Sequence, residues 1–305
     1  MKKKILISTG GSGGHVIPGT IFYDHLKNEF DVLLTIDERG KKFLNSNNYD
    51  LITINTPKLS RNIFLLPFNL LNISILLIRS LFLLKKNNIE QIISTGGYMS
   101  FPINLAAIIL NIEIYLFEPN MTLGQANNFF LKYCKKIFCY SKKIKKLASI
   151  NSSKIALIET LLRKEFYNTA INNKDYINRD VNLLIIGGSQ GARLFEEGLK
   201  KTIIQLSQKY KLKVYQQVNY LSLDKIKKFY YENNIQYQLF NYEVSILNVI
   251  KECNFCITRA GASTLSELTF SNLPFLAIPF ALAKDNHQYE NAHFYKDNNC
   301  CWLLT

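Results

Sequence analysis

Near its start the chain reads Lys4-Ile5-Leu6-Ile7-Ser8-Thr9-Gly10-Gly11-Ser12-Gly13-Gly14-His15. Residues 4–8 are apolar and predict a β-strand, and a helix is expected from about Pro18. Glycines at such a turn let the backbone approach a ligand, and the helix start contributes N–H groups and a positive dipole end. His15 adds a base that is useful near neutral pH. The stretch predicts an α/β unit with a ligand-binding loop, although its spacing is not the G-x-G-x-x-G of dinucleotide-binding loops.

Strands and helices are expected to alternate along the rest of the chain. Further strands are predicted at 31–36, 51–54, 89–94, 113–117, 136–140, 154–158, 182–186, 212–217, 235–240, 254–257 and 274–278. Helical patterns between them favour parallel sheets that are covered on both faces. Residues 164–180 are polar and aperiodic, which indicates a linker. We therefore expect an α/β protein of two doubly wound domains, 1–163 and 164–305, facing each other across a cleft.

Glycine turns recur at three more of the predicted strand ends. They are Thr95-Gly96-Gly97-Tyr98, Gly187-Gly188-Ser189-Gln190-Gly191-Ala192 and Arg259-Ala260-Gly261-Ala262-Ser263-Thr264. Ligands of doubly wound sheets bind beyond the carboxyl ends of the strands. A single turn of this kind is more often structural, but four of them across two domains favour a binding cleft.

The chain is basic, with 37 Lys and Arg against 23 Asp and Glu and a net charge of +14 over 305 residues. Residues 1–160 hold 20 basic and 10 acidic residues, so most of the excess lies there. Nucleic acid, an acidic membrane surface and a phosphorylated substrate are all suitable partners for such a surface. The excess of basic residues is equally explained by an AT-rich genome, whose codons favour Lys, Asn and Ile, without any functional role.

The six cysteines indicate a reducing compartment. Cys253-Asn-Phe-Cys256 has the spacing of a metal-binding pair, but no second Cys or His pair is suitably placed. We therefore predict free buried thiols and no metal site. The apolar run before the glycine loop is too short for a secretory signal.

The segment from Ile63 to Leu84 is strongly apolar but is interrupted by polar residues. Its charge-free part is shorter than the roughly 20 residues that a membrane-spanning helix needs. An amphipathic helix is therefore predicted, and two roles stay open for it. It packs on the sheet, or it dips into a membrane interface with Arg79, Lys85 and Lys86 near lipid headgroups. The basic cluster Lys132, Lys135, Lys136, Lys142, Lys143, Lys145 and Lys146 is either part of that surface or a solvated rim.

The motifs taken together resemble one family. They are GGSGGHVIPG at 10–19, STGGYMS at 94–100, FEPN at 117–120, GGSQGAR at 187–193, RAGASTLSEL at 259–268, LPFLAIPF at 273–280 and DNHQYENA at 285–292. This set, which covers nearly the whole chain, resembles the MurG family of UDP-N-acetylglucosamine transferases. The resemblance implies the GT-B glycosyltransferase fold, with a membrane-associating acceptor domain at 1–163 and a UDP-GlcNAc domain at 164–305. It also implies that the enzyme needs no metal, no other cofactor and no nucleic acid.

The family's reaction is an inverting hexosyl transfer in peptidoglycan synthesis. GlcNAc passes from UDP-GlcNAc to the 4-hydroxyl of MurNAc in undecaprenyl-pyrophosphoryl-MurNAc-pentapeptide, which converts lipid I to lipid II. The implied location is the cytoplasmic face of the bacterial inner membrane, as a peripheral protein beside other cell-wall synthesis proteins. The attacking hydroxyl needs a base, and His15 and Glu118 are the candidates, with His15 preferred. Contact with a phosphate is the alternative role for His15.

Other residues are expected to bind the two substrates. Ser12, Gly13 and Gly14 would cradle the pyrophosphate of the acceptor. A helix start after Arg259 can stabilise the leaving diphosphate with backbone donors, and Glu267 suits the two ribose hydroxyls unless it is only a first-turn acid. The full set of predicted substrate-binding residues beyond the first loop is Asn120, Arg163, Ser189, Glu243, Ala262, Ser263, Thr264, Leu265, Ser266, Glu267, Gln288 and Asn291.

The sequence departs from the family pattern at several positions. Pro119 stands where Gln is usual, Phe101 replaces a glycine, and His287 replaces the first of two glutamines. The residues before Arg163 also differ, which puts its placement in doubt. The chain ends at Thr305, where the family usually continues, so the C-terminal end is expected to be shortened.

Two other functions stay open at this stage. One is a different GT-B transferase that acts on a lipid acceptor, such as a diacylglycerol glycosyltransferase. The other is a truncated chain that binds a UDP-sugar without catalysis. A nicotinamide oxidoreductase is disfavoured, because Asp37 is the nearest acid after the second strand and does not have the ribose-reading spacing.

Overall fold

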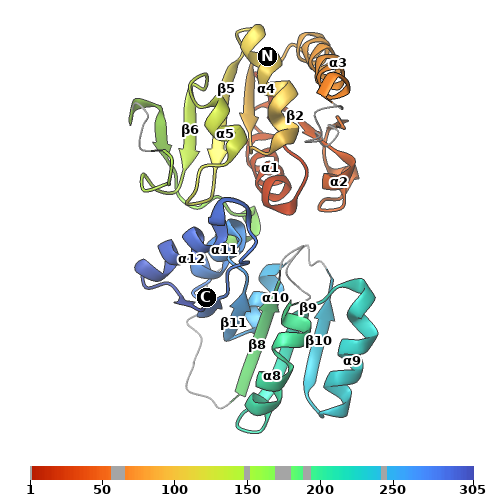
Figure 1. Cartoon of the computed structure of the whole chain (residues 1–305), viewed down its shortest axis with the longest axis vertical. Coiled ribbons are helices and arrows are strands. Elements are labelled where there is room, and N and C mark those ends of the chain that lie inside the picture. The colour runs from red at the N-terminus through yellow and green to blue at the C-terminus, as the bar shows by residue number, and fades with distance from the viewer. Residues whose placement is uncertain (1, 56–65, 148–151, 169–179, 188–193, 242–245) are drawn as a thin grey trace. The chain divides into compact units, whose positions relative to one another are not determined.

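The computed structural model describes residues 2–55, 66–147, 152–168, 180–187, 194–241 and 246–305. The chain divides into two compact units, unit 1 at Met1–Lys164 and unit 2 at Glu165–Thr305 (Figure 1). Each unit holds a parallel sheet whose strands alternate with helices along the chain. The expected linker 164–180 begins with a helical turn, α6 (Lys164–Tyr167), and its residues 169–179 lie outside the described part.

Unit 1 holds a seven-stranded sheet in the order β3-β2-β1-β4-β5-β6-β7, in which every pairing is parallel. Its strands are β1 (Lys4–Ser8), β2 (Asp31–Ile36), β3 (Leu51–Thr53), β4 (Gln91–Ser94), β5 (Glu113–Glu118), β6 (Lys136–Cys139) and β7 (Ile155–Leu157). Its helices are α1 (Gly13–Leu26), α2 (Glu38–Lys41), α3 (Leu66–Lys86), α4 (Phe101–Ile109) and α5 (Gln125–Phe130), with 3-10 turns η1 (Ser46–Asn48), η3 (Tyr98–Ser100) and η4 (Ser152–Lys154). The strands lie within two residues of their predicted positions, because apolar runs between polar turns mark buried parallel strands.

Unit 2 holds a six-stranded parallel sheet in the order β10-β9-β8-β11-β12-β13. Its strands are β8 (Asp180–Ile186), β9 (Lys211–Gln217), β10 (Gln236–Phe240), β11 (Phe255–Thr258), β12 (Phe275–Ala277) and β13 (Trp302–Leu303). Its helices are α8 (Lys200–Ser207), α9 (Leu223–Glu232), α10 (Ile246–Glu252), α11 (Ala262–Phe270) and α12 (His287–Asp297), with 3-10 turns η5 (Tyr220–Ser222) and η6 (Lys284–Asn286). Both sheets therefore have the strand order of the doubly wound fold, in which the order reverses beside the first strand.

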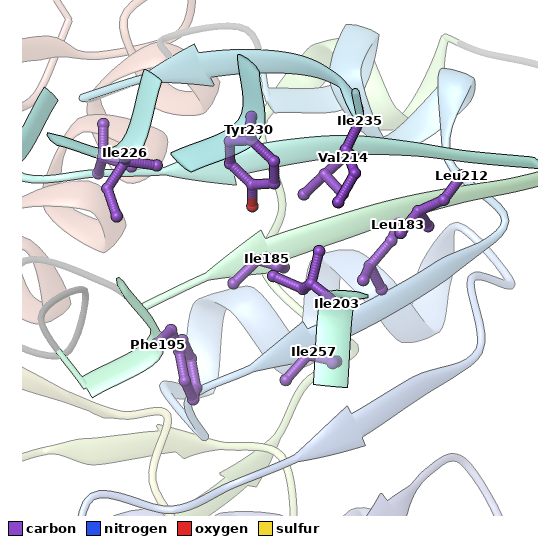
Figure 2. Packing of buried hydrophobic residues seen from close by; sticks show 11 residues of the cluster. Leu183, Ile185, Phe195, Ile203, Leu212, Val214, Ile226, Tyr230, Ile235 and Ile257 are labelled. Atoms are coloured by element: carbon purple, nitrogen blue, oxygen red, sulfur yellow. The ribbon is translucent and has the colours of Figure 1, made fainter. Parts of the chain in front are cut away.

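Each unit has a hydrophobic core of its own. In unit 1, Phe22 of α1 meets Phe117 of β5 edge to face, with ring centroids 5.1 Å apart. In unit 2, side chains from β8, β9 and β11 pack against Ile203 of α8 and against Ile226 and Tyr230 of α9 (Figure 2). Each fully buried aliphatic side chain contributes roughly 1.5–3 kcal/mol. Two separate cores of this kind hold the loops at the strand ends on rigid supports.

The segment predicted as an amphipathic helix forms α3, which has 21 residues. It buries Leu76, Ser80 and Leu84, and it packs beside α4. Of the helices that the structure describes, none combines the length and the hydropathy required to cross a bilayer.

Candidate active site

The first two glycine turns meet at the point where the strand order of unit 1 reverses. β1 and β4 are neighbours there, and the chain leaves them in opposite directions across the sheet. The Thr95 N–H donates to the Ser8 carbonyl at 3.1 Å, and Thr95 Oγ1 lies 2.9 Å from Thr9 Oγ1. Doubly wound sheets bind their ligands at this switch point. The geometry therefore makes the edge of β1 and β4 the candidate site of unit 1.

His15 stands in the first turn of α1, and its imidazole reaches the second glycine turn. Its Nδ1 lies 2.8 Å from the carbonyl oxygen of Thr95. A carbonyl only accepts hydrogen bonds, so Nδ1 carries the hydrogen and Nε2 is the basic nitrogen of the neutral ring. The ring rests on Gly97, where an added Cβ would come within 3.1 Å of His15 Cδ2. Gly97 also has φ +77°, so a glycine satisfies both the backbone and the imidazole there.

The start of α1 presents the residues that are expected to bind the acceptor. Ser12 is the N-cap, with extended φ and ψ, and its carbonyl accepts the N–H groups of His15 and Val16, each at 3.0 Å. Gly13 and Gly14 are the first residues of the helix, where N–H groups have no carbonyl four residues back to bind. Such N–H groups suit a phosphate oxygen.

Glu118 ends β5 and is 3% exposed. Its Oε1 accepts the backbone N–H of Asn120 at 3.2 Å and the side-chain amide of Asn120 at 2.9 Å. Its Oε2 accepts the Gly124 N–H at 2.8 Å and Asn127 Nδ2 at 3.0 Å. Four donors on one carboxylate fix the loop that contains Asn120, so Glu118 has a structural function whatever its chemical role.

Asp37 is a site residue that sequence reasoning missed. It follows β2 and is buried, and its Oδ1 accepts the Gly11 N–H at 2.7 Å. A carboxylate that holds the glycine loop in this way is not presented to a ribose. The signal was the position of an acid directly after the strand that neighbours β1 in a doubly wound sheet.

Arg163 lies at the end of unit 1, beside a carbonyl that α1 holds in place. His25 Nε2 lies 2.9 Å from the carbonyl oxygen of Leu162. This contact fixes the backbone immediately before Arg163, where the sequence differs from the family pattern.

In unit 2 two of the predicted residues, Ser189 and Glu243, lie outside the described residues. The third glycine turn, at 187–192, lies outside the described residues beyond Gly187. The fourth is described at the start of α11, where Gly261 is the N-cap and Ala262, Ser263 and Thr264 form the first turn. Leu265, Ser266 and Glu267 follow and are buried. α11 begins at the end of β11, which neighbours β8 where the strand order of this sheet reverses.

Hydrogen bonds inside unit 2 fix the orientation of α11 and α12. Ser266 Oγ donates to the Ala262 carbonyl and lies 2.9 Å from the hydroxyl of Tyr295. Burial raises the pKa of Tyr295 to about 12, so its hydroxyl stays protonated at any physiological pH. The Asn291 Nδ2 donates to the Ala260 carbonyl at 3.1 Å, which ties α12 to the turn before α11.

Gln288 has an amide whose orientation the backbone determines. The Phe280 N–H donates to Gln288 Oε1 at 2.9 Å. Because the oxygen is engaged there, the Nε2 group is the end of the amide that points elsewhere and donates. Gln288 therefore suits an oxygen-rich ligand such as a sugar or a phosphate.

Arg259 precedes the turn and is almost fully buried. Its Nη1 donates to the carbonyls of Ile278 and Pro279 at 3.0 and 2.8 Å, and its guanidinium lies over the rings of Phe195 and Phe280. Burial lowers the pKa of Arg259. Its Nε finds no hydrogen-bond partner among the residues that the structure describes. The guanidinium thus holds together the loops that follow β11 and β12.

The predicted free thiols are confirmed. All six cysteines are free, and Cys134, Cys139, Cys253 and Cys256 are buried. Within the described ranges no cluster of three His, Cys, Asp or Glu side chains could hold a metal ion.

Comparisons with known proteins agree with the resemblance that the motifs carry. The N-terminal domain of glycosyltransferase family 28 matches residues 5–139, and the C-terminal domain of that family matches residues 182–305. A Pelagibacter ubique UDP-N-acetylglucosamine–N-acetylmuramyl-(pentapeptide) pyrophosphoryl-undecaprenol N-acetylglucosamine transferase is 53% identical over 304 residues, covering 100% of this chain and 85% of that protein. The transferase of the same name from Rickettsia canadensis is 36% identical over 307 residues, covering 99% and 86%.

Solved structures share the fold at much lower identity. MurG of Acinetobacter baumannii superposes with a TM-score of 0.74 at 21% identity, covering 99% of this chain and 85% of that one. A UDP-N-acetylglucosamine 2-epimerase superposes with a TM-score of 0.61 at 14% identity, covering 97% and 87%. Since one fold serves different reactions, the fold alone does not identify the reaction. The sequence supplies what the fold does not, through the two family matches and the relatives at 53% and 36% identity. The chain therefore belongs to glycosyltransferase family 28 and, within it, to the MurG family of N-acetylglucosamine transferases.

Proposed function

We propose that the chain transfers GlcNAc from UDP-GlcNAc to the 4-hydroxyl of MurNAc in lipid I, with inversion at the sugar and without a metal. The observation that carries the proposal is the His15 imidazole, fixed by the Thr95 carbonyl at the switch point of unit 1. The named relatives are transferases of this acceptor class.

His15 is the proposed base. The Thr95 carbonyl accepts the Nδ1–H and so orients the imidazole. Nε2 can then accept the proton of the attacking hydroxyl, as the Nε2 of the histidine in a serine-hydrolase triad does. Glu118 is the second candidate, but its oxygens already accept four hydrogen bonds, three from the loop that follows β5 and one from Asn127 of α5. We therefore assign Glu118 to holding Asn120 and His15 to proton transfer.

The leaving UDP would be stabilised in unit 2. The first turn of α11, at Ala262, Ser263 and Thr264, offers backbone donors and the positive end of the helix dipole to the diphosphate. Glu267 would accept the ribose hydroxyls, and Gln288 and Asn291 would contact the sugar. Developing negative charge is the part of this reaction that preorganised donors stabilise most.

The proposed location is the surface of an anionic membrane. Leu71, Ile75, Ile78 and Phe82 of α3 are 59%, 40%, 65% and 68% exposed. Their spacings of four, three and four residues place them in one stripe of the helix. Arg79, Lys85 and Lys86 are exposed beside the stripe, as an interfacial helix on anionic lipid requires.

The test is transfer of radiolabelled GlcNAc from UDP-GlcNAc to a short-chain lipid I analogue in the presence of EDTA. We expect transfer by the wild type and a loss of about a hundredfold or more in kcat for His15→Ala, since general bases contribute that much. His293→Ala is the matched control, because His293 pairs with Asp297 on an exposed face of α12 and should keep full activity.

Glu118→Gln completes the design. We expect it to lower Tm as well as activity, because a buried amide would face donors that the carboxylate now accepts. Full stability together with loss of the acidic limb of the pH–rate profile, where the rate rises with pH as the base deprotonates, would instead make Glu118 the base. Transfer to diacylglycerol but not to the lipid I analogue would overturn the proposed acceptor, and UDP-GlcNAc binding without any transfer would indicate a binding protein.

A further inference from the structure

The buried carboxylate of Asp37 links the first glycine turn to an arginine. Besides the Gly11 N–H, Asp37 Oδ1 accepts the Gly40 N–H at 3.0 Å, and Oδ2 accepts Arg39 Nε at 2.7 Å. Asp37 is 2% exposed, whereas the Arg39 side chain is 40% exposed. The arginine is therefore anchored at Nε on a fixed acceptor, and its far end reaches the surface.

The guanidinium of Arg39 also touches the second glycine turn. It lies over the ring of Tyr98, 5.0 Å from the centroid, and its Nη2 lies 3.2 Å from Met99 Sδ. The Met99 side chain packs on Gly10, where an added Cβ would lie 3.3 Å from Met99 Cγ. Arg39 thus stands where the turns after β1 and β4 meet.

The terminal nitrogens of this guanidinium retain donor capacity. A thioether is a weak acceptor, and the Tyr98 ring attracts the cation without using its N–H groups. Within the described part of the chain, Nε is the guanidinium nitrogen that bonds to an oxygen, and the two Nη groups donate to none. A planar guanidinium held in this way fits two phosphate oxygens at once.

We propose that Arg39 binds the diphosphate of the lipid-linked acceptor, with its Nη groups on phosphate oxygens and with the N–H groups at the start of α1 beside it. This inference rests on the proposed function, which places the acceptor on unit 1. Asp37 is then a positioning residue, which sets both the Gly11 backbone and the plane of the guanidinium. The competing explanation is that Arg39 only joins the two turns.

The test measures binding without catalysis. Farnesyl diphosphate is titrated calorimetrically into the whole chain, and UDP is titrated into the same preparations as the internal reference. We expect Arg39→Ala to weaken farnesyl diphosphate binding about tenfold while the UDP affinity and Tm stay at wild-type values. Arg39→Lys keeps the positive charge but lacks the planar pair of Nη donors, so its affinity for farnesyl diphosphate should lie between those of Arg39→Ala and the wild type.

Two further variants complete the design. Arg39→Gln keeps a donor for Asp37 and removes the charge, so it replaces Arg39→Ala if that variant folds poorly. Lys27→Ala is the matched control, because it removes an exposed cation that pairs with Asp24 at the far end of α1 and should leave farnesyl diphosphate binding unchanged. In steady state, Arg39→Gln should raise KM for the lipid I analogue far more than it lowers kcat, with KM for UDP-GlcNAc unchanged.

Each other outcome overturns the inference. Unchanged farnesyl diphosphate affinity in both Arg39→Ala and Arg39→Gln would leave Arg39 as a structural link only. Equal loss of UDP and farnesyl diphosphate affinity with a lower Tm would mean the same. If either result is obtained and the wild type still transfers GlcNAc to lipid I, the proposed function stands and only the role of Arg39 in binding the diphosphate is rejected. A wild type that neither binds farnesyl diphosphate nor transfers GlcNAc would overturn both.

Discussion

Gly97 is the residue on which the position of the proposed base depends. Its φ of +77° is strained for any residue with a Cβ, and the imidazole of His15 occupies the space that a Cβ needs. We expect Gly97→Ala to cost roughly 1–2 kcal/mol in the free energy of unfolding and to lower kcat by tenfold or more, because the imidazole must move. Chemical denaturation and GlcNAc transfer measure the two effects.

Gly198 provides the matched control for that substitution. A Cβ added at Gly198 meets nothing within 4 Å, and its φ lies outside the left-handed range. Gly198→Ala should therefore change stability by less than about 0.5 kcal/mol and leave kcat unchanged. If Gly97→Ala behaves like Gly198→Ala, the imidazole does not depend on that glycine.

At the scale of residues, the sequence predicts the glycine turns and His15 but not the contacts that orient them. His15 is recognisable from its motif, whereas its bond to Thr95, 80 residues away, exists only because β1 and β4 are neighbours. The same applies to Asp37, which reaches Gly11 across two adjacent strands. Side-chain orientation, as at Gln288, depends on which backbone N–H lies nearby, and no local pattern carries that information.

At the scale of elements, α3 presents an exposed apolar stripe that can be tested directly. We expect the double variant Ile78→Glu and Phe82→Glu to abolish cosedimentation with vesicles of anionic phospholipid, because two carboxylates would face the headgroups and the acyl boundary. Transfer to a water-soluble short-chain acceptor should remain. Each substitution removes apolar surface that is already exposed, so the fold should tolerate both.

Asn72→Glu on the same helix is the control for added charge. Asn72 is exposed and flanks the stripe, so this variant should keep most of the vesicle binding. Equal binding by the wild type and the double variant would show that α3 is not the membrane-contacting face.

The strands of both units except β13 were predicted from sequence, whereas β13, the ends of the helices and the start of unit 2 were not. Apolar runs between polar turns identify β1 or β9 because buried parallel strands are apolar on both faces. α6 was expected to be linker, since it is short and polar. Its order comes from a tertiary contact: Phe166 is buried, and the ring of Tyr167 lies 5.6 Å from that of Phe270. Such a contact joins residues a hundred positions apart and leaves no periodic signal.

At the scale of the whole molecule, the six thiols report on the integrity of both cores. Burial raises the pKa of Cys134, Cys139 and Cys256, and it raises the pKa of Cys301 to about 11. Only about one Cys301 in a thousand is a thiolate at pH 8. We expect slow native labelling by iodoacetamide, confined to Cys300 and Cys301, and reaction of all six in guanidinium. Mass spectrometry of the peptides measures both.

The same shifts predict how stability responds to alkaline pH. The folded-state pKa values lie above those of the unfolded thiols, so the unfolded state loses protons first as pH rises. Stability should therefore be complete below about pH 8.5 and decline towards pH 11. Rapid native labelling of Cys256, or stability that increases over this range, would contradict the burial described for both units.

Every strand of unit 1 runs in the same direction, which gives its sheet two unlike rims. Lys4 and Ser8 are separated by about 13 Å of strand, so the chain enters β1 at one rim and leaves it for the glycine turn at the other. A biotin or fluorophore attached ahead of Lys2 would thus sit on the rim away from His15 and Arg39. The enzyme could be tethered to a sensor surface by that attachment with its reacting groups still open to soluble substrates, which makes single-molecule recording of its turnover a practical design.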